Sequence, residues 1–175
     1  VDHAEAIVGF PGGFGTMDEV FESLVLIQTG KSPIVPVVLV EGQDGDFWQR
    51  WEDFTKGALL KEGWISPEDP GLYRIVSSPE EAVEEITSFY RVYQSARYVH
   101  DKLVLRLTRA LTEEELAILN EEFSILIASG RIENTAALPE EEEVTHLPRL
   151  VFHHTKHKFG LLRQLIDRIN GFDAP

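Results

Sequence analysis

The residues best suited to chemistry lie in one short stretch near the start of the chain, GFPGGFGTMDE at positions 9–19. It follows the small and apolar residues 6–8, which are typical of the end of a strand buried on both faces. Its glycines permit a positive φ and let another group approach the backbone closely. Thr16 is placed to cap a helix whose unpaired N–H groups and positive end attract anions. The stretch therefore predicts a strand, a phosphate-binding turn and a helix N-terminus.

Glu19 is the carboxylate that follows this turn, one helical turn beyond Thr16. A carboxylate there can orient water or sugar hydroxyl groups and stabilise developing positive charge. The pattern Thr16-x-x-Glu19 is also a capping box, in which the glutamate only bonds back to the Thr16 amide. Glycine turns, likewise, often make tight strand-to-helix connections that bind nothing. The residues alone leave these alternatives open.

The turn fits neither of two common phosphate-binding motifs. A Walker A loop continues with Lys-Ser/Thr after its last glycine, whereas Gly15 is followed by Thr16 and Met17. The GxGxxG dinucleotide fingerprint requires a spacing different from that of GGFG. The turn by itself therefore predicts a phosphate site without naming the ligand.

The sequence PGGFGTMDE resembles the PGGxGTxxE motif of the lonely-guy (LOG) proteins, a family often labelled "possible lysine decarboxylase". The resemblance continues through the apolar residues 33–40, an aromatic-rich helix, EGWISPED and SSPEEAVEEI, and so covers about the first 90 residues. It implies a Rossmann-like homodimer that hydrolyses the N-glycosidic bond of nucleoside 5′-monophosphates, with cytokinin riboside monophosphate as one candidate substrate. The products would be the free base and ribose 5-phosphate.

The decarboxylase label conflicts with the residues near the turn. A pyridoxal-dependent enzyme needs a Schiff-base lysine in its cofactor pocket. The nearest lysine after the turn, Lys31, lies beyond the predicted helix. We therefore expect no cofactor and no decarboxylase activity.

The resemblance suggests roles for the residues of the motif. The groups expected to bind the 5′-phosphate of the substrate are backbone amides and one hydroxyl, from Gly12, Gly13, Phe14, Gly15 and Thr16. Glu19 would be the catalytic carboxylate beside an oxocarbenium-like ribose. Glu22 shares its helix face and would assist in substrate binding or raise the pKa of Glu19. The motif does not supply a group that protonates the leaving base, so this acid is expected to be an upstream arginine or a residue of the partner subunit.

Two other functions remain open at this point. A non-catalytic nucleotide-binding or sensing protein would use the same turn to hold a phosphate, without turnover. A structural module would use the glycines only for a tight turn, and phosphate would then leave its thermal stability unchanged.

Composition narrows the class of protein. The 175 residues are 43% hydrophobic and 26% charged, as in a soluble globular chain with one core or two small ones. The net charge of −14 argues against a nucleic-acid partner, which would require a basic face. The chain has no cysteine, no signal peptide and no apolar run approaching the ~18 residues of a membrane span. We expect a cytoplasmic protein with no membrane partner.

The motif lies close to the first residue, Val1, and a parallel strand needs neighbours in its sheet. We therefore expect these residues to be the C-terminal part of a longer protein. The first half of the resembled family, with a catalytic arginine before the PGG motif, has no counterpart in the sequence.

Residues 1–95 predict the C-terminal half of a Rossmann-like parallel sheet domain. Val20, Leu24 and Ile27 recur at helical spacing after the turn. The following segments alternate between strand and helix patterns. A strand is predicted at 34–40, although Pro36 weakens it, and an aromatic helix with a mostly buried face is predicted from 47 to near Gly63. A strand at 73–76 and a helix from 79 to about 94, capped by Ser78, complete this half.

Residues 96–175 predict a small α+β module with the order βαββα. The first expected elements are a strand at 103–108 and a helix at 112–129, which begins with a Thr112-x-x-Glu115 capping box and ends at Gly130. Two strands follow, at 131–138 and 150–154, with an acidic turn at 139–143 between them. The last element is a helix at 159–170, which ends at Gly171. Such a module would have an antiparallel sheet covered on one face by two helices.

Two clusters in this module contain residue types that could bind a ligand. The histidines at positions 146, 153, 154 and 157 lack the helical i, i+4 pair or the cysteines of a zinc pattern, so we expect no metal. A group of basic residues predicts a solvated helix face, with docking against the acidic residues 140–143 as the alternative. Its members are Arg149, Lys156, Lys158, Arg163 and Arg168.

Overall fold

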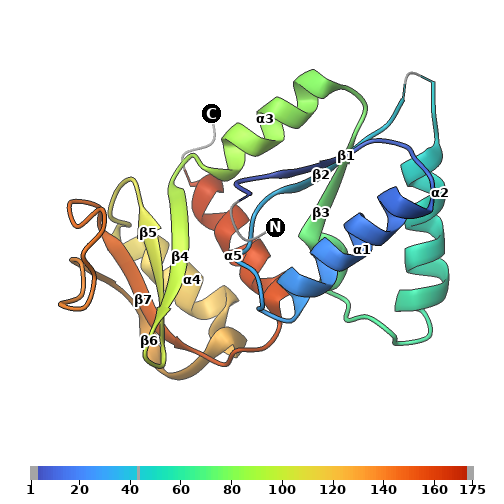
Figure 1. Ribbon diagram of the computed structural model, residues 1–175. Coiled ribbons are helices and arrows are strands. Elements are labelled where there is room, and N and C mark those ends of the chain that lie inside the picture. The colour runs from blue at the N-terminus through green and yellow to red at the C-terminus, as the bar shows by residue number, and fades with distance from the viewer. Residues whose placement is uncertain (1–3, 43, 173–175) are drawn as a thin grey trace. The chain divides into compact units, whose positions relative to one another are not determined.

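The computed structural model describes residues 4–42 and 44–172, which form two compact units (Figure 1). The first unit runs to Ser88 and includes Lys158–Arg163, and the second unit comprises Phe89–His157 and the residues from Gln164 onward. The first unit holds a parallel sheet and the second an antiparallel one, which confirms the expected fold class. None of the helices in the described part of the chain is long and apolar enough to span a membrane.

The sheet of the first unit has the order β1-β2-β3, with β1 (Ile7–Gly9), β2 (Val37–Val40) and β3 (Tyr73–Val76) all parallel. The central strand β2 is completely buried. It begins at Val37 rather than at residue 34, because Pro36 has no N–H to donate to the ladder. Within the described residues β1 pairs only with β2, and Val8 is 42% exposed. The prediction that this strand is buried on both faces is therefore wrong.

Helices cover both faces of this sheet. Val38 and Val40 of β2 pack against Ala82 of α3 (Pro79–Phe89). On the opposite face, a Cβ added at Gly9 would meet side chains from β2, from α1 (Phe14–Gln28) and from α2 (Phe47–Phe54). The layers are thus those of an open α/β sheet, with the α1 N-terminus following the carboxyl end of β1.

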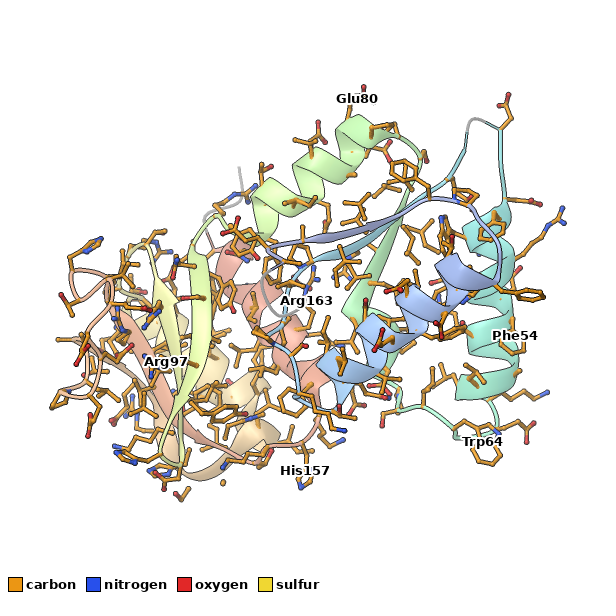
Figure 2. All side chains as sticks on the ribbon, viewed as in Figure 1. Phe54, Trp64, Glu80, Arg97, His157 and Arg163 are labelled. Carbon is orange, nitrogen blue, oxygen red and sulfur yellow. The ribbon has the colours of Figure 1, made fainter. Side chains whose placement is uncertain are left out.

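Helix α2 supplies the aromatic core of the first unit. Trp48 and Trp51 are buried, which confirms the predicted buried face for these two residues, whereas the prediction is wrong for Phe54. The helix continues as a π-helical turn, Thr55–Leu60, and Gly63 follows with a φ of 76°. Figure 2 shows Phe54 and Trp64 pointing outward, and they are 55% and 78% exposed. The aromatic segment therefore has one buried and one exposed side.

Helix α3 is capped as predicted, since Ser78 Oγ accepts a hydrogen bond from Glu81 N at 3.2 Å. The helix ends at Phe89 rather than near residue 94. The backbone N–H groups of Val92 and Tyr93 instead donate to the side-chain oxygen of Asn170, at 2.9 and 3.0 Å. The chain then enters β4 (Tyr93–Val99), a strand that the sequence analysis missed.

The second unit is a four-stranded antiparallel sheet in the order β4-β5-β7-β6. Its other strands are β5 (Lys102–Leu107), β6 (Ile127–Thr135) and β7 (Arg149–His154), and its helices are α4 (Glu113–Glu122) and the end of α5 (Phe159–Gly171). With β4 included, the order of elements is ββαββα rather than βαββα. All of β7 except His153 is buried, so the sheet is covered on both faces.

Helix α4 begins as predicted and ends earlier than predicted. Both hydrogen bonds of the Thr112–Glu115 capping box are present. The helix stops at Glu122, and a short 3-10 turn at Ser124–Leu126 leads into β6. The Asn120 side chain ties the helix to this strand, because it hydrogen bonds to both the N–H and the carbonyl of Ile132. Gly130, with a φ of 72°, lies inside β6 and does not stop a helix.

The segment at residues 136–148, here called the acidic strap, connects β6 to β7 and covers one face of the sheet. Leu138 of the strap packs against a cluster formed by Val99, Val104 and Val151. Glu141 of the strap is buried as well. The strap therefore supplies both an apolar and an ionic contact to the sheet.

Candidate functional site

The glycine turn links β1 directly to α1. The helix begins at Phe14, and its N-cap residue is Gly13, which offers no side chain for capping. Met17 N donates to Gly13 O at 3.1 Å, so the helical hydrogen bonds begin at the Gly13 carbonyl, three residues before Thr16. Thr16 lies in the first helical turn, and the predicted Thr16 cap and its capping box with Glu19 are wrong.

The glycines of the turn serve close approach rather than unusual dihedral angles. Among the described glycines only Gly30, Gly63 and Gly130 have a positive φ, so the turn does not use the positive φ that its glycines permit. A Cβ at Gly12 would overlap the Thr16 hydroxyl, whereas a Cβ at Gly13 or Gly15 would meet nothing within 4 Å. The backbone at Gly13 and Gly15 is therefore open to a ligand.

A groove of about 580 Å³ runs along the end of β1 and the first turns of α1. Three of the predicted site residues line it, namely Gly15, Thr16 and Glu19. The rest of the lining is mostly apolar and comprises Ala4, Ile7, Val8, Gly9, Phe10, Pro11, Val20 and Ser23. The groove thus combines a helix N-terminus, one carboxylate and apolar walls.

The other predicted site residues lie outside the lining of this groove. Gly12, Gly13, Phe14 and Glu22 are exposed, and Phe14 is 97% exposed. Gly12 lies against the side chain of Thr16, which lines the groove. Glu22 lies one turn beyond Glu19 on α1, where the structure does not bring it into the groove.

The N–H groups of the first turn of α1 are suited to an anion. Residues 14–16 precede the first intrahelical donor, Met17, so their N–H groups have no partner within the helix. The positive end of the helix dipole adds to their attraction for a phosphate. This donor set lies at the same end of the groove as Thr16.

Two groove residues were not singled out from the sequence. Ser23 is buried, and its Oγ donates to the carbonyl oxygen of Glu19 at 2.7 Å. Its spacing of four residues from Glu19 was the available signal. Phe10 is 55% exposed and forms an aromatic wall, and its position just before Pro11 was read only as a feature of the turn.

Two histidines of the second unit contact protein side chains. His153 Nδ1 lies 3.0 Å from an Asp101 oxygen, and His154 Nδ1 lies 2.6 Å from the Tyr98 hydroxyl. Burial lowers the pKa of His154 to about 4 and raises the pKa of Tyr98 to about 12. Within the described residues no group of three or more His, Cys, Asp or Glu side chains is placed to hold a metal ion.

The basic residues divide into buried and exposed ones. Arg149 and Arg163 are 0% and 1% exposed, so the prediction of a solvated helix face is wrong for both. Arg149 Nε donates to Glu141 at 2.9 Å, which is the alternative docking against the acidic residues. Arg163, labelled in Figure 2, pairs with Glu85 at 2.9 Å. Lys156 and Lys158 are exposed.

Comparison with known proteins gives one family. Residues 1–86 match the family model described as "Possible lysine decarboxylase". This range contains β1, β2, β3 and the whole groove, and it ends within α3. No curated protein sequence matches the chain. The match supports the family label for the first unit.

Proposed function

We propose that the groove at the α1 N-terminus hydrolyses the N-glycosidic bond of nucleoside 5′-monophosphates, releasing the free base and ribose 5-phosphate. The observation that carries this proposal is the presence of a helix N-terminus and the carboxylate residue Glu19 in one groove. A phosphate at the helix end would place the sugar beside the carboxylate, one turn further along. The matched family supports a common origin with the LOG proteins, which the motif resembles.

In this reaction a water oxygen attacks C1′ of the ribose as the C1′–N bond breaks. The base leaves with the bonding electron pair and takes up a proton, while the water loses one. The sugar carries positive charge in the transition state, and the Glu19 carboxylate would stabilise that charge and orient the water. Phe10 would contact the base at the wall of the groove.

The groove does not suit lysine decarboxylation. Its described lining contains no lysine that could form a Schiff base, and Lys31 follows the C-terminal end of α1. The family description therefore refers to a chemistry for which these residues are unsuited.

We also propose that the active protein is a homodimer and that a partner residue protonates the leaving base. Support comes from apolar side chains exposed on the turn and along α1, with Phe10, Phe14 and Val25 exposed by 55%, 97% and 50%. A second copy would bury this surface and would close the groove against water.

The test is a scan of nucleoside 5′-monophosphates for release of free base by the full chain. Replacement Glu19→Gln is expected to lower kcat by about a hundredfold or more while phosphate binding persists. Asp18→Asn is the matched control, because Asp18 is exposed on the same helix and lies outside the groove. Full activity in Glu19→Gln would remove the catalytic assignment. Tight nucleotide binding without turnover in the wild type would instead indicate a sensing protein.

A further inference from the structure

Two arginines lie directly opposite each other on neighbouring strands of the second unit. Arg106 on β5 pairs in register with Arg149 on β7, and the two residues are 8% and 0% exposed. Like charges in such a cross-strand pair repel each other, and burial removes the water that would screen them. The pair therefore needs an anion beside it.

Glu141 of the acidic strap supplies an anion at this position. Its side chain is fully buried, and its two oxygens accept hydrogen bonds from Arg106 Nε at 3.2 Å and from Arg149 Nε at 2.9 Å. Arg149 also donates to the strap carbonyls of Glu143, Val144 and Leu147. The strap thus satisfies the donors of Arg149 closely.

The strap offers fewer hydrogen-bond acceptors to the guanidinium group of Arg106 than to that of Arg149. Its Nη2 is buried and has no hydrogen-bond partner within the described residues. Its Nη1 lies 3.7 Å from the Glu143 carboxylate, beyond hydrogen-bond distance. A buried guanidinium donor without an acceptor is unfavourable, so one carboxylate is a poor fit to this pair of arginines.

The same sheet face carries further positive charge in an otherwise acidic chain. The register places Lys102 and Arg97 on the face of Arg106, and Figure 2 labels Arg97 on β4. A cleft of about 310 Å³ lies beside the strap. Its lining combines Leu138 of the strap with Lys102, Arg131, His153 and one carboxylate, Glu133. Arg131 lies 3.7 Å from Glu133, and His153 lies 3.0 Å from Asp101, so Lys102 is the basic residue of the lining for which no ion pair is described.

We propose that Arg106 and Arg149 form a binding site for the phosphate group of a small molecule, and that Glu141 occupies this site as an internal substitute. A phosphate has enough oxygens to accept from Nε and Nη2 of Arg106 and from Arg149 together, in the planar fork geometry that guanidinium groups favour. The strap would have to lift for the exchange. This inference concerns the second unit and stands independently of the proposed hydrolase activity.

Phosphate titration of the full chain tests the site, with chloride at equal ionic strength as the reference. We expect the Nε–H NMR signals of Arg106 and Arg149 to shift with added inorganic phosphate. In Glu141→Gln the internal carboxylate is neutral, so calorimetry should show phosphate binding about tenfold tighter than in the wild type.

Replacement Arg106→Lys keeps the charge beside Glu141 but removes the Nη2 donor, and should weaken phosphate binding about tenfold. Arg50→Lys is the matched control, because Arg50 is an exposed arginine in the first unit. Arginine signals that ignore phosphate in both the wild type and Glu141→Gln would overturn the proposal. So would equal phosphate affinity in Arg106→Lys and the wild type. If Glu141→Gln does not fold, the wild-type titration and Arg106→Lys still decide the question.

Discussion

The hydroxyl of Thr16 lies so close to Gly12 that a side chain at position 12 would overlap it. Gly15, three residues further on, has open space where its Cβ would be. The two glycines belong to the same strand-to-helix connection, but only position 15 has room for a side chain. The close approach of the Thr16 side chain therefore requires glycine at position 12, whereas the space at position 15 does not.

Alanine substitutions at these two glycines should change stability in opposite directions. Gly12→Ala should lower the free energy of unfolding by about 1–3 kcal/mol, because Thr16 must move. Gly15→Ala should raise it by up to about 1 kcal/mol, because alanine favours the first helical turn and meets no neighbour. Urea unfolding monitored by circular dichroism measures both. Equal effects at the two positions would contradict the packing described for Thr16.

Phe14 offers a test of self-association. Its 97% exposed ring contributes little to the folded monomer, so Phe14→Ser should leave the unfolding temperature nearly unchanged. In a homodimer that buries this ring, the same change should weaken association about tenfold or more. Sedimentation equilibrium over a range of concentrations gives the dissociation constant. Phe54→Ser is a comparison at another exposed ring, and a monomeric wild type would end the dimer proposal.

Glu141 should stabilise the second unit in a pH-dependent way. Burial alone would raise its pKa, but hydrogen bonds from Arg149, from Leu138 N–H and from Arg106 outweigh burial, so the pKa lies below the ordinary value of 4.5. A lowered pKa in the folded state gives stability that is present above pH 4.5 and is lost as the pH falls.

Replacement Glu141→Gln should therefore cost about 3 kcal/mol of unfolding free energy at pH 7, with a smaller cost below pH 4.5. Glu142→Gln is the control, since this neighbouring strap residue is exposed and should change stability by less than about 0.5 kcal/mol. A cost for Glu141→Gln that does not shrink in acid would show that the buried ion pair is not its source.

His154 should make the protein less stable in mild acid. Burial lowers its pKa from 6.5 to about 4, so the unfolded chain binds more protons than the folded protein between these values. Stability is then fully present above pH 6.5 and falls as the pH decreases toward 4. Replacement His154→Gln should flatten this pH dependence by a few kcal/mol in urea unfolding between pH 4 and 7. His146→Gln, at an exposed position, should leave the slope unchanged.

Local sequence signals predicted the elements whose causes are local. The burial of Trp48 and Trp51, the Ser78 cap and the Thr112–Glu115 capping box all depend on neighbours within a few residues. The end of α3 depends on Asn170, which satisfies the N–H groups of Val92 and Tyr93 from far along the chain. No local pattern carries that information, and β4 was missed for this reason.

In the candidate site and in the arginine cluster, too, features with local causes could be predicted and features that depend on distant residues could not. The glycine motif located the turn and the position of Glu19, which lines the groove. The start of α1 was misplaced because a threonine was preferred as N-cap over a glycine, although glycine also occupies that position. The burial of Arg149 has no local signal in the sequence, because it depends on Arg106 and Glu141, which meet it only in the folded sheet.

Helix α5 belongs to both units, with its residues up to Arg163 in the first and those from Gln164 in the second. Phe159 lies against Gly30 and Arg163 pairs with Glu85, both within the first unit. A shortened chain ending near residue 95 would therefore lose part of the first unit as well as the second. Engineering that swaps, fuses or removes one unit has to keep this helix intact, because each unit contains part of it.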